Sequence, residues 1–169
     1  MAVIEINGRT YPTLGQLPKL GESIPDSCAV DSSFRDVLLS EFTGNVLVLN
    51  IFPSIDTSTC SASVKKFNEM ATKLPNVVVV CVSADLPFAQ KRFCESFELA
   101  NIHILSTLRG DFGRMLGVEV AEGPMRGLMS RAVLVVGADG IIRYVEHVTD
   151  LLNTTVDYGK VWKLLSALA

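Results

Sequence analysis

Cys60 is the residue of this sequence whose position most clearly predicts chemistry. It closes the stretch PSIDTSTC (53–60), which follows an apolar run typical of a buried strand and precedes a stretch typical of a helix. A cysteine in the first turn of a helix meets unpaired backbone N–H groups and the positive end of the helix dipole, and both favour the reactive thiolate. The position therefore favours a nucleophilic thiol over the alternative, an inert cysteine near the core.

The residues around Cys60 indicate what such a thiol could act on. Thr57 and the hydroxylated residues beside it could orient the sulfur or an oxygen-rich substrate, and Pro53 would keep the chain extended and shield one side of the pocket. A disulfide reductase of the thioredoxin kind carries C-x-x-C here, whereas this chain has T-x-x-C. Because Cys60 has no second thiol beside it, the pattern favours the positioning of a small polar substrate over disulfide exchange.

A strand, a helix and a second strand must hold Cys60 in place. The runs NVLVLNIF (45–52) and NVVVVCVS (76–83) are continuously apolar, as in strands of a parallel sheet whose faces are both covered. Between them, residues 61–74 carry apolar side chains at helical spacing, and Pro75 ends this pattern. The order predicts a βαβ unit with a right-handed crossover.

The remaining stretches predict a single α/β domain over residues 1–169, with a mixed sheet. No repeat or linker divides the chain. The further elements that we expect are a β-hairpin about Asn7-Gly8, short extended pieces near Cys28 and at 37–39, a helix over 87–99, a short strand over 101–105, one or two helical turns over 111–117, two antiparallel strands within 131–148 and a closing helix over 157–168.

Composition and charge exclude several classes of function. The 169 residues carry a net charge of −3, which offers no basic surface for nucleic acid or an anionic membrane. No run approaches the ~20 apolar residues of a membrane span. The start of the chain does not resemble a secretory signal, so we expect a cytoplasmic protein. The four cysteines form no C-x-x-C pair, which disfavours a zinc ribbon.

Two motifs resemble those of a known family. The P-x-x-x-T-x-x-C pattern of Pro53, Thr57 and Cys60 resembles the peroxidatic motif of the peroxiredoxins, and LNIFPSIDTSTCSASVKKFNE resembles their bacterial thiol peroxidase branch. The stretch SADLPFAQKRFC (83–94) is similar to a second signature of that branch, including its resolving cysteine. The resemblance extends over nearly the whole chain. It implies a thioredoxin-like fold, with a central mixed β-sheet flanked by helices and an N-terminal β-hairpin.

The resemblance implies a role for each site residue. The Cys60 thiolate would attack the distal oxygen of a peroxide and become a sulfenic acid, which Cys94 would resolve as an intramolecular Cys60–Cys94 disulfide. Thr57 would hydrogen-bond the peroxide or the thiolate, and Arg131, just before the strand AVLVV, would approach the thiolate. Sequence physics alone does not choose Arg131 over Arg126 or Arg143. Neither a metal nor an organic cofactor is implied.

A disulfide between two distant segments makes a geometric demand. It needs Cα atoms within about 7 Å, yet Cys60 and Cys94 are expected to begin two different helical stretches. We therefore expect the turns around both cysteines to unwind during the cycle. Of the other cysteines, Cys81 is expected in the core, and Cys28 is either inert or an exposed, oxidisable thiol.

The resemblance also implies partners. Hydrogen peroxide and organic hydroperoxides would be the substrates, thioredoxin the reductant, antioxidant defence the role and a homodimer the assembly. The apolar residues Phe52, Ile55 and Phe88 suggest a preference for alkyl hydroperoxides. A peroxide-sensing relay that uses the same thiols is the alternative, which turnover with a reductant would distinguish. A structural α/β module with silent thiols would require both motifs to be accidental.

Overall fold

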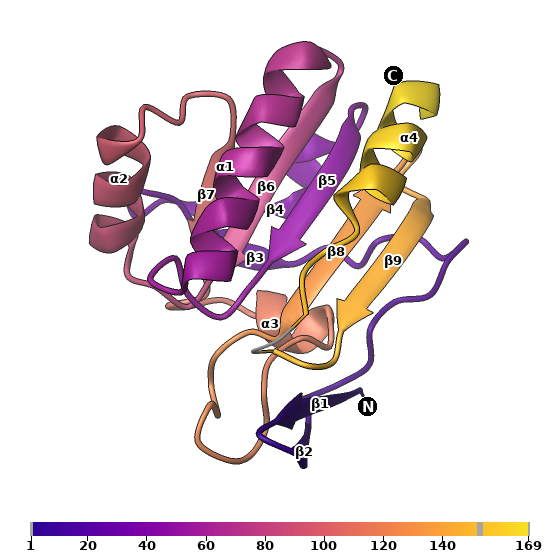
Figure 1. Ribbon diagram of the computed structural model, residues 1–169. Helices are drawn as coiled ribbons and strands as arrows, with labels where there is room; N and C mark the ends of the chain where they lie inside the picture. Colours follow the sequence, from indigo (N-terminus) through magenta and orange to yellow (C-terminus); the bar gives the residue numbers. More distant parts are fainter. Residues whose placement is uncertain (1, 152–153, 169) are drawn as a thin grey trace.

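A mixed β-sheet forms the centre of the computed structural model, which describes residues 2–151 and 154–168 (Figure 1). In the described residues this sheet has seven strands in the order β4-β3-β7-β6-β5-β8-β9. The strands are β3 (Cys28–Val30), β4 (Asp36–Leu38), β5 (Val46–Ile51), β6 (Val77–Ser83), β7 (His103–Ser106), β8 (Arg131–Val136) and β9 (Ile142–Val148). The predicted fold class, a central mixed sheet flanked by helices, is confirmed.

The parallel centre of the sheet arises from the two apolar runs. Strand β5 pairs in parallel with β6, β6 pairs in parallel with β7, and β8 lies antiparallel on the other side of β5. Every residue of β5 is buried, as expected for a strand with both faces covered. The two strands predicted within 131–148 are β8 and β9, which pair as antiparallel neighbours.

Helices and irregular segments cover the two faces of the sheet. The helices are η1 (Leu39–Phe42), α1 (Ser58–Lys73), α2 (Pro87–Ser96), α3 (Phe112–Met115) and α4 (Tyr158–Leu168). Helices α1 and α4 lie on one face, with α2 toward β7 (Figure 1), and Phe67 of α1 and Val161 of α4 belong to the core beneath them. On the other face, Leu39 of η1 and Phe112 of α3 belong to a second core cluster.

Two helix boundaries differ from the predicted ones. Helix α1 begins at Ser58 rather than at residue 61, because Thr57 in an extended conformation caps it. Helix α2 ends at Ser96 rather than at residue 99, because Glu98 adopts a left-handed conformation with φ of 54°. The earlier start of α1 brings Cys60 into its first turn, as the sequence predicts.

The predicted hairpin at the N-terminus is confirmed. Strands β1 (Val3–Ile6) and β2 (Arg9–Pro12) are antiparallel, and Asn7 and Gly8 take the positive φ angles, 52° and 80°, of a tight hairpin turn. In the described ranges no helix is both long and apolar enough to cross a membrane. The expectation of one domain remains a prediction.

Candidate active site

Cys60 lies at the third position of α1, directly after the loop that leaves β5. Its backbone N–H donates to the Thr57 hydroxyl oxygen at 3.3 Å, and the same hydroxyl donates to the carbonyl oxygen of Ser54 at 3.2 Å. Thr57 therefore satisfies one of the unpaired N–H groups at the helix start and ties this turn to the preceding loop. Thr57 is thus the N-cap of α1.

Arg131 brings a positive charge to the sulfur. It is the first residue of β8, the strand that pairs with β5, and its side chain extends to the first turn of α1. Its Nη2 lies 3.3 Å from Cys60 Sγ and also donates to Thr59 Oγ1 at 2.8 Å and to the Leu151 carbonyl at 3.5 Å. Arg131 is only 2% exposed, so this contact forms away from bulk water.

One donor of Arg131 remains unused. Its Nε is buried and has no hydrogen-bond partner among the described residues. A buried donor without a hydrogen-bond partner lowers the stability of the fold. A role in binding a ligand is one explanation for such a group. The geometry therefore provides a free N–H on the same guanidinium that touches the Cys60 sulfur.

Two polar residues that the sequence analysis did not identify form a chain of hydrogen bonds to the backbone of Cys60. Ser63 Oγ donates to the Cys60 carbonyl at 2.7 Å, and Asn50 Nδ2 donates to Ser63 Oγ at 3.1 Å. Asn50 and Ser63 are both 1% exposed. The signal was a single asparagine inside the apolar run of β5, because a buried polar side chain in such a run needs a specific partner.

The loop between β5 and α1 has a buried side and an exposed side. Pro53 is buried, whereas Thr57 is exposed at the surface. Phe52 and Ile55, 0% and 4% exposed, belong to the core, and Phe88 is 71% exposed. Of the three apolar residues expected to favour alkyl hydroperoxides, Phe88 alone is open to a substrate.

Cys94 is placed differently from the expectation. It does not begin a helical stretch but lies in the last turn of α2, because this helix starts at Pro87. Helices α1 and α2 both start where a parallel strand ends, and the seven residues from Pro87 carry Cys94 about 10 Å along α2 from that edge. All four cysteines are free thiols. The structure therefore holds Cys60 and Cys94 apart.

Burial disfavours ionisation of Cys94 in this arrangement. The thiol is half-buried against the core cluster that contains Cys60, and it lines a cavity of 380 Å³ between α2 and the β3–β4 turn. Burial, with a smaller contribution from the neighbouring Glu95, raises the pKa of Cys94 above its ordinary value. Opening of α2 that exposes Cys94 to water would remove the contribution of burial.

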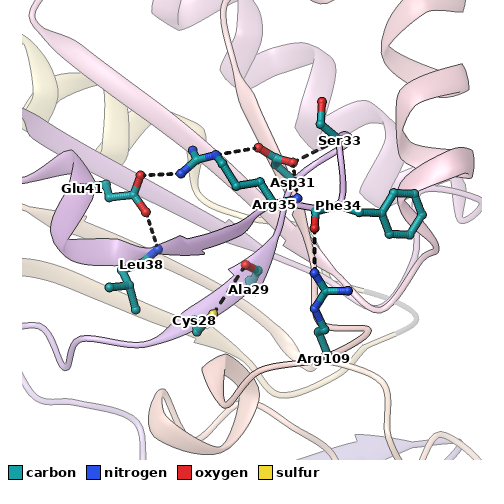
Figure 2. A network of polar contacts seen from close by, with 9 residues as sticks. All are labelled: Cys28, Ala29, Asp31, Ser33, Phe34, Arg35, Leu38, Glu41 and Arg109. Carbon is teal, nitrogen blue, oxygen red and sulfur yellow. Dashed lines mark hydrogen bonds and ion pairs between the residues drawn. The ribbon is translucent and has the colours of Figure 1, made fainter.

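Cys28 lies in β3, which β7 and β6 separate from β5, and Figure 2 shows it near the charged residues Arg35, Glu41 and Arg109. Its Sγ contacts the Ala29 carbonyl at 3.8 Å, while its backbone N–H donates to Asp111 at 2.9 Å. Burial, Asp36 and Asp111 raise the pKa of Cys28. This environment favours the inert reading of Cys28 over that of an oxidisable thiol.

Cys81 lies within β6 and is fully buried, as predicted. Burial raises its pKa from 9.0 to about 12. Below pH 9 this thiol is neutral in both the folded and the unfolded chain, and above pH 9 it ionises only in the unfolded chain. The free energy of unfolding should therefore fall as pH rises from 9 toward 12.

We expect this loss to disappear in a Cys81→Ala variant. Between pH 9 and 10.5, the free energy of unfolding of the wild type should fall by about 1 kcal/mol per pH unit more than that of the variant. Urea titrations of both proteins across this range would measure the difference. Parallel pH profiles would show that Cys81 does not ionise on unfolding as described.

The two histidines, His103 and His147, lie in strands β7 and β9 of the sheet, and burial lowers the pKa of both. Among the described residues, no hydrogen bond joins either histidine to Cys60. Within residues 2–151 and 154–168, no group of three or more His, Cys, Asp and Glu side chains could hold a metal ion.

Comparison with known proteins shows the family of this chain. A family model described as Redoxin matches residues 19–161. The chain belongs to the redoxin family. A thiol peroxidase of Corynebacterium glutamicum is 40% identical over 158 residues, which cover 94% of this chain and 95% of that protein. A thiol peroxidase of Mycobacterium bovis is 42% identical over 151 residues, which cover 89% of this chain and 91% of that protein.

Solved structures give the same family. The crystal structure of a peroxiredoxin-like protein from Aquifex aeolicus superposes with a TM-score of 0.92 at 32% identity, covering 99% of this chain and 97% of that one. A thiol peroxidase from Chromobacterium violaceum, at 24% identity and a TM-score of 0.86, shares the fold. The resemblance to the bacterial thiol peroxidases is thus confirmed, and this redoxin is a peroxidase of the peroxiredoxin type.

Proposed function

We propose that this redoxin reduces hydrogen peroxide and organic hydroperoxides to water or alcohols through Cys60 and Cys94. The observation that carries the proposal is the 3.3 Å contact between Arg131 Nη2 and Cys60 Sγ at the start of α1. A guanidinium and a helix N-terminus both stabilise a negative sulfur, and the thiolate is the form that attacks a peroxide.

The first step is a nucleophilic displacement on oxygen. A sulfur lone pair of Cys60 attacks the distal peroxide oxygen, the S–O bond forms and the O–O bond breaks. The proximal oxygen leaves with the electron pair and takes up a proton as water or an alcohol, and Cys60 becomes a sulfenic acid. The unused Nε of Arg131 is the group that we assign to the peroxide oxygens as charge develops on them.

Thr57 and Pro53 shape the pocket in this proposal. The Thr57 hydroxyl now donates to Ser54, and we assign it to the peroxide once substrate enters. Pro53 is buried, and we assign to it the role of limiting the access of water to the sulfur.

The second step joins two thiols that the fold keeps apart. The Cys94 thiolate attacks the Cys60 sulfur, the S–S bond forms, and the sulfenic oxygen leaves as water. Since Cys94 lies in the last turn of α2, this helix must open locally. A dithiol protein must then reduce the disulfide, and thioredoxin is the reductant that we propose, for a cytoplasmic homodimer in antioxidant defence.

Mass spectrometry of the reduced protein after one equivalent of hydroperoxide tests this cycle. We expect a loss of two hydrogens and a peptide map in which Cys60 is linked to Cys94. A Cys28→Ser variant should give the same product, because β7 and β6 separate β3, which carries this thiol, from β5. Stable oxygen on Cys60, or a link to another cysteine, would exclude Cys94 as the resolving thiol, and unreacted cysteines would refute the proposed chemistry.

A further inference from the structure

Asp85 connects two segments of the chain. One is the loop of residues 52–57 between β5 and α1, called here the Cys60 loop, and the other is residues 84–86, which lead into α2 and Cys94. Asp85 lies between β6 and α2, and its carboxylate accepts hydrogen bonds from two residues of the Cys60 loop. Ser54 Oγ donates to Oδ1 at 2.7 Å, and the Ile55 backbone N–H donates to Oδ2 at 2.9 Å. Asp85 is the only residue shown, among those described, to accept hydrogen bonds from both Ser54 and Ile55.

Buried groups hold the Asp85 side of this connection in place. Ser83 Oγ donates to Asp85 Oδ2 at 2.5 Å, and Ser106 Oγ donates to the Asp85 carbonyl at 2.6 Å. Gln90, inside α2, donates to Ser83 Oγ at 3.1 Å and to the Leu105 carbonyl at 2.9 Å. Because Ser83, Gln90 and Ser106 are all fully buried, the start of α2 is anchored to the ends of β6 and β7.

A second contact joins α1 to α2 at the other end of α2. The Lys65 ammonium lies 3.6 Å from the centre of the Phe97 ring, and it touches neither the Cys60 loop nor Asp85 in the described structure. The two contacts therefore differ in what they hold. Asp85 holds the Cys60 loop and the start of α2 together, whereas Lys65 holds only the end of α2 that carries Cys94.

We propose that Asp85 is a positioning residue that couples the two halves of the peroxidase cycle. Its carboxylate holds the Cys60 loop in the arrangement that reacts with peroxide, and it keeps α2 closed until Cys60 is oxidised. Loosening this contact should misplace the Cys60 turn and at the same time ease the opening that brings Cys94 to it. The proposal rests on the proposed function, since it assigns opposite effects to its two chemical steps.

Rapid-quench mass spectrometry with hydrogen peroxide separates these steps, because sulfenic acid and disulfide differ in mass. In Asp85→Asn we expect the rate constant of Cys60 oxidation to fall by about tenfold or more, while the rate constant of disulfide formation rises. Ser54→Ala keeps Asp85 and removes one donor from the loop, so it should change both rate constants in the same directions by a smaller factor. It also keeps the proposal testable if Asp85→Asn fails to fold.

Lys65→Met is the matched comparison, because it removes the contact at the far end of α2. We expect it to leave the oxidation of Cys60 unchanged and not to slow disulfide formation. A merely structural role of Asp85 would lower the melting temperature without separating the two rate constants.

The outcomes separate the inference from the function on which it rests. Unchanged oxidation rates in folded Asp85→Asn and Ser54→Ala, or equal slowing of both steps, would overturn the coupling while the cycle itself stands. A wild-type protein that forms neither sulfenic acid nor the Cys60–Cys94 disulfide would overturn the proposed function first.

Discussion

Replacing Cys60 with serine is expected to abolish peroxide reduction, with a loss of about 10⁴-fold or more in kcat/KM. The hydroxyl of serine is a far weaker nucleophile than a thiolate and cannot enter the sulfur oxidation ladder. The structure gives no other thiol the same surroundings, because burial raises the pKa of Cys28, Cys81 and Cys94. Peroxide consumption with thioredoxin and its reductase measures the loss.

Two other serine variants make this result specific. Cys94→Ser should still react with one equivalent of peroxide, but Cys60 should then carry a sulfenic acid that further peroxide converts to sulfinic acid. Cys28→Ser should turn over as the wild type does, since this residue lies beyond β7 from the site. Substantial peroxidase activity in Cys60→Ser with an unchanged melting temperature would mean that another residue attacks the peroxide.

The strand and helix that carry Cys60 could be predicted because local signals agree there. The apolar run of β5 has one interpretation, a strand covered on both faces, and Thr57 three residues before Cys60 fits a helix start. Each signal depends on residues that are neighbours in the chain. That is why the first turn of α1 was predicted within three residues of its observed start.

The end of the helix that carries Cys94 could not be predicted as well. The end of α2 depends on a left-handed residue, Glu98, and glutamate carries no intrinsic preference for that conformation. Such an end is set by what the following loop must reach, here the start of β7. The expectation that Cys94 begins a helical stretch was wrong for a different reason, because the helix that the sequence predicts from Pro87 already places Cys94 in its later part.

The contacts of Arg131 and Asp85 also could not be predicted from local sequence signals. Arg131 is 71 residues from Cys60 in the chain, and β8 brings it close only because this strand pairs with β5. Asp85 meets Ser54 because β5 and β6 are adjacent and end at the same edge. The resemblance named Arg131 among several arginines, whereas nothing in the sequence reading named Asp85.

Replacing Arg131 with methionine should lower kcat/KM for hydrogen peroxide by about 10²- to 10³-fold. Methionine fills a similar volume but removes the charge beside Cys60 Sγ and the unused Nε donor. Arg131→Lys keeps the positive charge but places it on a single ammonium nitrogen. This nitrogen cannot contact the Cys60 sulfur and also supply the separate donor that arginine offers to the peroxide. The activity of this variant should lie between those of the methionine variant and the wild type.

Stability separates a chemical effect of Arg131 from a structural one. Arg131→Met leaves the Thr59 hydroxyl and the Leu151 carbonyl without the donor that they contact, so its melting temperature should fall, and activity should be compared at a temperature where both proteins are folded. Arg143→Met is the control, because Arg143 pairs with Asp139 at 2.7 Å in a partly exposed ion pair and has no contact with Cys60 in the described structure. Arg131→Met with wild-type kcat/KM at that temperature would show that the guanidinium beside the sulfur plays no part in the reaction.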